Sequence, residues 1–341
     1  ATRINPYPAD YWLEMATAYS VAGDNKRLEN AIERAQRAAP FDTAVLWDVA
    51  NLNLMRGDTA EGLRQLRTAM QYSADSWDRY VQLCWRITGS VDTVLRDAIP
   101  PVSQAYSSLL QLTVYEDRPE DAVKVWSAAE SLKLPMEKAE ALRYFDFLLN
   151  RGRAADAEQQ WRRFAGYSPV LARYGSSDEN LIVNPRFEQP VLNGGLDWRY
   201  ASAQDATVAM DPGTSRTGRA SLSMRLNGTP SDSGIYQLVP ISPGVSYRIS
   251  ADVRSELQGI NGPRLAVFDA YTNERIFLSE EVAGDTDWHE IGGIFRAPGT
   301  ASLIAVRIVR WPYQTQIRGR LWMDEVTLTQ ASGVRGGRGA M

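Results

Sequence analysis

Residue types that carry catalysis are scarce in this 341-residue chain, which has one histidine and one cysteine. With His289 alone, a Ser-His-Asp triad or a metal site built on paired histidines would be hard to assemble. A glycosidase or polysaccharide lyase would instead need two carboxylates across a cleft, about 5–10 Å apart. The acidic residues available for such a pair in the C-terminal half include Asp252, Asp269, Glu280 and Glu281. Because no spacing pairs any two of them, the sequence favours a non-catalytic protein, with a glycosidase or lyase as an alternative.

The overall composition argues against several classes of partner. The chain has 37 Lys and Arg against 41 Asp and Glu, a net charge of -4, so it lacks the basic excess of a nucleic-acid-binding protein. Cys84 lies in a helical pattern and is predicted to be a small buried residue. No run approaches the 18 or so consecutive apolar residues of a membrane-spanning helix. The chain begins at Ala1 without methionine, which is compatible with the removal of an upstream signal or anchor.

The first half contains an internal repeat. Two Gly-Asp pairs, Gly23-Asp24 and Gly57-Asp58, lie 34 residues apart, and apolar residues recur around both in register. The glycine is expected to end one helix, and small residues after it allow the next helix to pack closely. Residues 9–167 resemble the tetratricopeptide repeat, with about five repeats, of which two are close to the consensus and three are divergent. The register degrades at residues 77–100 and recovers after residue 103.

A solenoid of such repeats would have a concave groove, and grooves of this kind hold a peptide or a partner's helix. The candidate groove residues are polar side chains on the first helices of the repeats: Asn51, Asn53, Gln82 and Arg86. The alternative is that these side chains belong to an ordinary solvated helix face. The tryptophans of this half are predicted to pack between helices.

The second half follows a different pattern, which begins near Ser176. Apolar residues alternate in short runs, such as Ile304, Val306 and Ile308, and turn residues separate the runs. About nine to eleven strands without a helical pattern indicate an antiparallel β-sandwich or jelly roll. The predicted fold is therefore α + β and multidomain, with an all-α solenoid followed by this sandwich.

The opening and the end of the second half carry a more specific signal. The opening is "NLIVNPRFE", and the final strand is "GRLWMDEVTL". This order resembles the galactose-binding-like jelly rolls, especially carbohydrate-binding modules of the family 4 and 9 type. The resemblance implies a structural calcium ion held by Glu188 and Asp324, with backbone carbonyls near Ser221 as further ligands, and such hard oxygen ligands suit Ca²⁺. Alternatively, Glu188 pairs with an arginine and Asp324 faces solvent.

The resemblance also implies sugar binding, which needs aromatic faces for pyranose rings and planar hydrogen-bonding side chains. Trp311 and Tyr313 in "VRWPYQTQ" are the first candidates because they lie in one loop beside the sheet. The full candidate set consists of aromatic, arginine and amide side chains: Trp311, Tyr313, Arg307, Arg254, Tyr236 and Gln237. Trp198 and Trp322 are predicted to pack in the core or at an edge.

The predicted organisation is a helical domain at 1–170, a linker at 171–178, a jelly roll at 179–330 and a disordered tail at 331–341. The leading hypothesis is a non-catalytic scaffold of the bacterial cell envelope, periplasmic or extracellular. Its repeats would dock a protein partner or peptide, and its jelly roll would bind a polysaccharide during assembly or export. This association with exopolysaccharide or O-antigen machinery is implied by resemblance to such repeat proteins. The alternative is a pure protein-interaction scaffold with a structural jelly roll.

Overall fold

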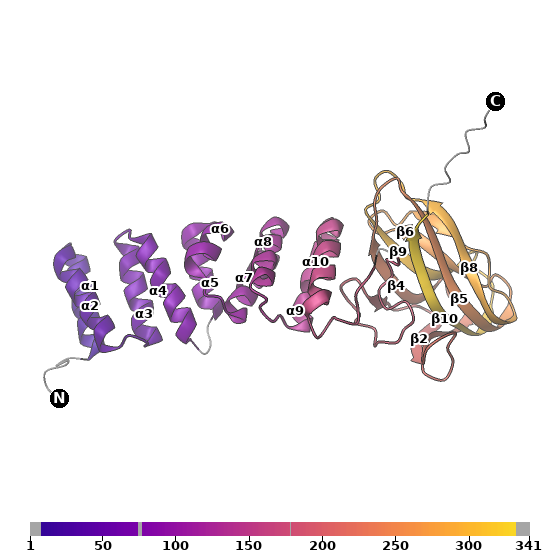
Figure 1. Cartoon of the computed structure of the whole chain (residues 1–341), viewed down its shortest axis with the longest axis horizontal. Helices are drawn as coiled ribbons and strands as arrows, with labels where there is room; N and C mark the ends of the chain where they lie inside the picture. The colour runs from indigo at the N-terminus through magenta and orange to yellow at the C-terminus, as the bar shows by residue number, and fades with distance from the viewer. Residues whose placement is uncertain (1–7, 74–76, 178, 332–341) are drawn as a thin grey trace, which may run out of the picture. The chain divides into compact units, whose positions relative to one another are not determined.

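The computed structural model describes residues 8–73, 77–177 and 179–331 and shows helices followed by two β-sheets (Figure 1). This arrangement confirms the predicted α + β class with a helical first half and an antiparallel sandwich. The chain forms two compact units that divide between Glu137 and Lys138. Of the predicted tail, residues 332–341 lie outside the described residues, as does residue 178 of the predicted linker.

The described part of the N-terminal unit is entirely helical. Its helices are α1 (Ala9–Ala22), α2 (Asn25–Ala38), α3 (Thr43–Met55), α4 (Thr59–Tyr72), α5 (Trp77–Thr88), α6 (Val91–Thr93), a π-helical turn (Val94–Ala98), α7 (Ser103–Tyr115) and α8 (Pro119–Ser131). Consecutive helices pack in pairs, α1 on α2, α3 on α4 and α7 on α8, as a repeat solenoid requires. The third pair is irregular, because α5 is followed by only α6 and the π-helical turn where the repeat register degrades.

The repeated Gly-Asp pair explains how the first helices end and the second begin. Gly23 adopts φ 71°, a left-handed conformation that closes α1 and favours glycine. The carboxylate of Asp24 then accepts a hydrogen bond from the backbone N–H of Arg27 and caps α2. Asp58 caps α4 in the same way through the N–H of Glu61. The prediction from the 34-residue spacing is confirmed at both positions.

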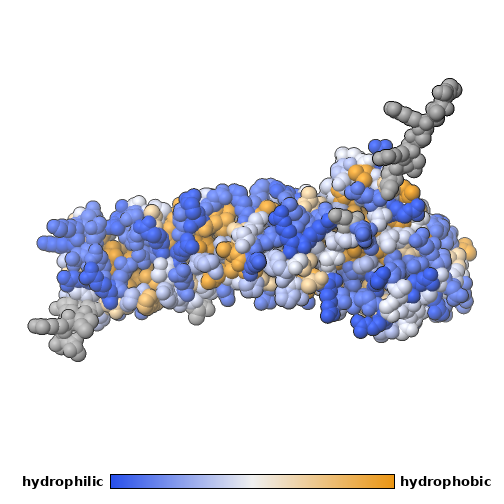
Figure 2. Space-filling view, in the orientation of Figure 1, coloured by the Kyte–Doolittle hydropathy of each residue, from blue (hydrophilic) through white to orange (hydrophobic). Residues whose placement is uncertain are grey.

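The interior of this unit matches the predicted core. Cys84 is fully buried, and burial raises the pKa of its thiol to about 12, so it is a packing residue as expected. On the face of the molecule shown in Figure 2, hydrophobic residues also reach the surface in patches along the helices. No helix in the described ranges is long and apolar enough to cross a membrane.

The last two helices, α9 (Lys138–Asn150) and α10 (Ala154–Tyr167), belong to the same compact unit as the sheets. The carboxylate of Asp146 accepts hydrogen bonds from the backbone N–H of Gly195 at 2.8 Å and from the guanidinium of Arg199 at 2.6 Å. The hydroxyl of Tyr271 donates to the carbonyl of Leu149 at 2.8 Å. Helix α9 is therefore attached to the sandwich at two separate places.

Helix α10 contributes the buried side chain of Trp161. Its indole N–H donates to the carbonyl of Tyr174 at 2.8 Å, and its ring lies against Gly195. A Cβ atom on Gly195, which has φ 62°, would come within 2.2 Å of that ring, so only glycine fits. The predicted domain extents, 1–170 and 179–330, thus follow secondary structure, whereas the compact units divide before α9.

The sandwich consists of two five-stranded antiparallel sheets. Sheet A has the order β1-β4-β9-β6-β7, with β1 (Trp198–Tyr200), β4 (Asp232–Pro240), β9 (Leu303–Arg310), β6 (Pro263–Asp269) and β7 (Arg275–Leu278). Sheet B has the order β2-β3-β10-β5-β8, with β2 (Ala206–Asp211), β3 (Ser221–Gly228), β10 (Ile317–Gln330), β5 (Ser246–Gly259) and β8 (Asp285–Arg296).

The strands turn alternate residues towards a shared core between the two sheets. Ile304, Val306 and Ile308 of β9 are buried there together with Tyr247 and Ile249 of β5. Their sequence neighbours consequently lie on the two outer faces. Each sheet therefore presents one outer face, and these faces carry the polar and aromatic residues considered below.

Candidate functional site

The centre of the outer face of sheet A is built around Arg307. Arg307 lies directly between Tyr236 of β4 and Ala266 of β6 in the strand register. Its guanidinium carbon is 5.6 Å from the ring centre of Tyr236 and 5.4 Å from that of Phe268. Such distances are those of cation–π contacts, which hold the planar cation between two rings.

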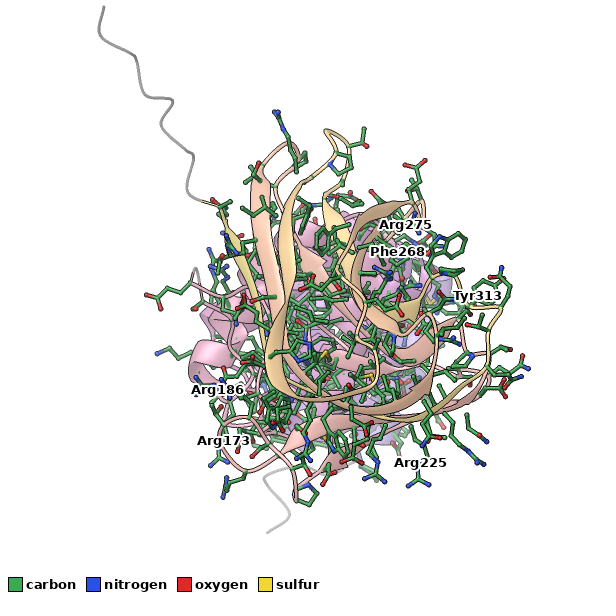
Figure 3. All side chains as sticks on the ribbon, turned by 90° about the vertical axis from the view of Figure 1, so that its right-hand side faces the viewer. Arg173, Arg186, Arg225, Phe268, Arg275 and Tyr313 are labelled. Carbon is green, nitrogen blue, oxygen red and sulfur yellow. The ribbon has the colours of Figure 1, made fainter. Side chains whose placement is uncertain are left out.

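The loop after β9 continues this surface. The rings of Trp311 and Tyr313 lie 6.1 Å apart between their centres, and both are exposed, at 52% and 37% of the residue surface. The guanidinium carbon of Arg275 lies 5.3 Å from the ring centre of Trp311, and Arg275 is the register partner of Phe268. Figure 3 shows Phe268, Arg275 and Tyr313 together on one flank of the sandwich.

We call this set the aromatic–arginine row; its members are Tyr236, Arg307, Phe268, Arg275, Trp311 and Tyr313. Neither of its arginines forms an ion pair with a described carboxylate, so the row is cationic. Burial raises the pKa of nearby Asp232, and the positive charge of Arg307 opposes that shift. At the β1 edge the face ends at Arg199, whose guanidinium is held by Asp146 of α9.

This arrangement suits non-covalent binding. Exposed rings offer flat apolar surfaces, and guanidinium groups offer planar hydrogen-bond donors. Phe268 and Arg275 were not among the sequence candidates. Phe268 could have been found from "RLAVFDA", since alternation places it on the face opposite to buried Leu265 and Val267. Nothing local indicates that Arg275 reaches Trp311, because the loop brings them together.

The structure corrects one of the six sequence candidates and places a second one on the other sheet. Gln237 is fully buried, and its amide bonds both the N–H and the carbonyl of Val183, so it offers no group to a glycan. Arg254 lies on β5 in sheet B, where its guanidinium carbon is 5.4 Å from the ring centre of Trp322. Arg254 therefore lies on the outer face of sheet B, whereas Arg307 lies on the outer face of sheet A. The other four candidates lie together in the row.

The polar groove candidates of the helical unit differ in exposure. Asn53 is 1% exposed and lies among packed helices, which removes it from any open groove. Asn51 is half-buried and donates to the carbonyl of Trp47, one turn earlier. Gln82 and Arg86, one turn apart on α5, are exposed and available to a partner. Their role in docking stays a prediction.

The carboxylates considered for glycoside hydrolysis are each engaged in local structure. Asp269 accepts backbone N–H bonds from the turn after β6. Glu281 pairs with Arg264 at 3.1 Å. Glu280 accepts a bond from a backbone N–H of β8, and Asp252 lies 3.6 Å from the guanidinium of Arg216. These contacts stabilise turns and strands.

The predicted calcium ligands meet at one loop. Asp324 is fully buried, and one of its oxygens accepts the N–H groups of Arg216 and Thr217. Glu188 accepts the N–H of Arg219 in the same loop at 2.6 Å, and its carboxylate lies 3.5 Å from the guanidinium of Arg219, which is the arginine pairing that the alternative predicted. Burial raises the pKa of Asp324, and none of the described residues forms an ion pair with it. Hard carboxylate oxygens around one loop fit Ca²⁺ in donor type, although no described cluster of three acidic, His or Cys residues is present.

Comparison with known proteins bears on the sandwich. Residues 179–315 match the model of a family described as "Carbohydrate binding domain". The match supports glycan binding and indicates a binding rather than a catalytic role for this domain. No curated protein sequence matches the chain.

Solved structures with similar folds include three that contain carbohydrate-binding modules. One, described as "CBM4 structure and function", is 15% identical, with TM-score 0.35, over 44% of this chain and 99% of its own. TmCBM61 in complex with β-1,4-galactotriose is 20% identical, with TM-score 0.32, over 45% and 99%. The CBM22-1–GH10 modules of xylanase 10B from Clostridium thermocellum are 19% identical, with TM-score 0.33, over 45% and 29%.

Proposed function

We propose that the jelly roll binds a glycan chain along the aromatic–arginine row of sheet A. The observation that carries this proposal is the row of rings and guanidinium groups that runs from Tyr236 to Tyr313. Trp311 and Tyr313 would stack on pyranose rings, and Arg307 and Arg275 would donate hydrogen bonds to ring hydroxyls. The family match of residues 179–315 supports this role.

Isothermal titration against a panel of neutral and acidic oligosaccharides tests the proposal. For the ligand that binds best, Trp311→Ala with Tyr313→Ala is expected to weaken binding by about 10–100-fold, because an aromatic contact contributes about 0.5–1.5 kcal/mol beyond the area it buries. The matched control is Tyr115→Ala, which removes a ring that is 86% exposed in the helical unit. No binding to any glycan, or equal loss in the control, would refute the proposal.

We propose further that Glu188 and Asp324 hold a structural calcium ion that fixes the loop at residues 216–219. The buried carboxylate of Asp324 without a cationic side-chain partner supports this. Calcium is expected to raise the Tm of the protein, and a chelator to lower it by several degrees. In Asp324→Asn, which keeps a hydrogen-bond acceptor but loses the charge, the Tm should no longer respond to calcium.

For the whole chain, we propose a non-catalytic scaffold in which the helical unit docks a protein partner while the jelly roll holds a polysaccharide. The pairing of helical repeats with a carbohydrate-binding domain supports this, as do the exposed side chains of Gln82 and Arg86. An assembly or export role at the bacterial cell envelope is part of the same proposal. If Gln82→Glu with Arg86→Glu abolishes partner capture while Trp311→Ala has no effect on any function, the jelly roll is only structural.

A further inference from the structure

The outer face of sheet B carries a second arginine-rich surface. Arg225 of β3 is the direct register partner of Arg320 of β10, and Arg318 stands two residues away on the same face of β10. The neighbouring core residues Met224 and Leu321 point inwards, so alternation directs these arginines outwards. Arg225 and Arg318 are exposed, and Arg320 is half-buried. We call these three residues the sheet-B arginine cluster.

No described carboxylate forms an ion pair with any arginine of this cluster. Glu256 is the register partner of Arg320 on its other side, but its carboxylate lies 3.4 Å from Arg254. Asp211 accepts the indole N–H of Trp322 at 2.8 Å, and its charge interacts favourably with that of Arg320 without forming an ion pair. Like charges directly opposite each other in a sheet are destabilising. The pairing of Arg225 with Arg320 therefore carries a like-charge repulsion that a bound anion would relieve further.

Trp322 packs against two arginines of this face of sheet B. Its ring is 4% exposed and lies 5.2 Å from the guanidinium carbon of Arg320 and 5.4 Å from that of Arg254. The hydrogen bond to Asp211 fixes the indole in the sheet. A stacked guanidinium loses less conformational freedom on binding than a free one, so Arg320 is preorganised for a ligand.

A depression of 310 Å³ adjoins the cluster. Arg225 and Arg320 line it together with the carboxylate of Asp211 at one end, and smaller side chains and Met210 complete the lining: Thr207, Ala209, Met210 and Ser223. Its volume is at the lower end of small-molecule sites, which span about 300–1,000 Å³. Two hydroxyl groups can bond ligand hydroxyls, and guanidinium groups bind carboxylate or sulfate oxygens in a bidentate manner.

We propose that this depression is a second binding site, which takes the anionic groups of an acidic saccharide. This proposal shares one assumption with the proposed function, namely that the ligand is a saccharide. Its residues belong to sheet B, so the two sites can be tested separately. Arg225 also lies well apart from Tyr313 in Figure 3. The jelly roll would thus bind neutral sugar rings on sheet A and acidic groups on sheet B.

The test compares the full chain with Arg225→Gln/Arg320→Gln by titration with tetragalacturonate, a sulfated tetrasaccharide and inorganic phosphate. The expected result is binding of at least one acidic tetrasaccharide by the wild type and a loss of at least tenfold in the double variant. The matched control is Arg248→Gln, which removes an exposed arginine from the same face of sheet B, on β5. Which oligosaccharide binds distinguishes a uronate from a sulfated ligand.

Three results would overturn the proposal: no binding of either acidic tetrasaccharide, equal binding by wild type and double variant, or phosphate binding as tight as that of the oligosaccharides. Thermal unfolding of the double variant identifies a folding defect, because loss of the like-charge repulsion and of the Arg320–Trp322 contact should together leave Tm close to that of the wild type. The double variant Trp311→Ala/Tyr313→Ala separates the two proposals. It should retain acidic binding on sheet B even if sheet A binds no glycan.

Discussion

The outer faces of the two sheets use the same residue types in opposite positions. On sheet A the rings of Trp311 and Tyr313 are exposed, and Arg307 lies between rings. On sheet B the ring of Trp322 is 4% exposed, and the guanidinium groups lie outermost. An exposed ring favours stacking on uncharged ligands, whereas an exposed guanidinium supported by a ring favours anions. The two faces have similar residue types, so the expected ligand of each depends on whether its rings or its guanidinium groups face the solvent.

The carboxylates near the two faces differ as well. On the sheet A side, burial raises the pKa of Asp197 to about 7. On the sheet B side, the hydrogen bond from Trp322 lowers the pKa of Asp211. The first carboxyl is held as a neutral group up to near pH 7, while the second is held as an anion. Four measurements test this contrast.

The strongest predicted change is in the pH dependence of stability, and it comes from Asp197. Between about pH 4 and pH 7 the folded protein keeps a proton on Asp197 that the unfolded chain has released, so stability falls as pH rises through this window. The rise of the pKa from 3.8 to about 7 can change the free energy of unfolding by at most about 4 kcal/mol across this window, at about 1.4 kcal/mol per pKa unit. Asp197→Asn should remove this slope in denaturant titrations. An unchanged slope would show that Asp197 ionises normally.

The next effect concerns the planar cation of sheet A. Arg307→Lys keeps the charge but loses the flat group between Tyr236 and Phe268, and glycan affinity should fall about tenfold, or about 1.4 kcal/mol. The matched change on sheet B is Arg254→Lys, next to Trp322. It should leave the sheet A ligand unaffected. Equal losses in titration calorimetry would mean that the two faces are not independent.

A smaller effect is expected from salt. Exposed charges are screened at high ionic strength, where the Debye length falls from about 10 Å at 0.1 M to about 3 Å at 1 M. Binding of an acidic tetrasaccharide at the sheet-B arginine cluster should weaken several-fold between these concentrations. Binding of a neutral oligosaccharide on sheet A should change little. A strong salt effect on the neutral ligand would contradict the contrast.

The smallest effect concerns Asp211. Its folded pKa lies below its unfolded value, so its contribution is present above the unfolded pKa and is lost as pH falls through the folded pKa. Asp211→Asn should cost about 0.5–1.5 kcal/mol at pH 7, the usual contribution of one hydrogen bond, and less near pH 3. Thermal unfolding at both pH values measures the difference. A loss that grows towards pH 3 would contradict it.

The sequence predicted the two-part fold because both of its periodicities are local. The 34-residue repeat placed Gly23 and Asp24 at helix ends, and alternation placed Arg307 opposite the core residues Val306 and Ile308. The prediction for Gln237 is wrong because this polar residue lies on the inward side of β4, fully buried. In the structure, backbone groups of Val183 satisfy its amide.

Other features depend on contacts between residues distant in the sequence. Strand order decides which arginines share a face, and alternation cannot show that Arg254 and Arg307 belong to different sheets. The attachment of α9 depends on Asp146 meeting Gly195 and Arg199, which no local pattern predicts. Likewise, the adjacency of Arg225 and Arg320 follows only once β3 and β10 are known to pair.

The attachment of α9 and α10 to the sandwich bears on which part of the chain can change in length during evolution. These two helices pack on the jelly roll through Trp161, whose ring lies against Gly195, and through Asp146, which accepts the N–H of Gly195. Repeats before Lys138 could then be added or lost over evolution without disturbing the binding faces. A fragment starting at residue 138 would keep both helices with the sandwich, whereas a cut at residue 170 would remove Asp146 and Trp161 and uncover the backbone around Gly195.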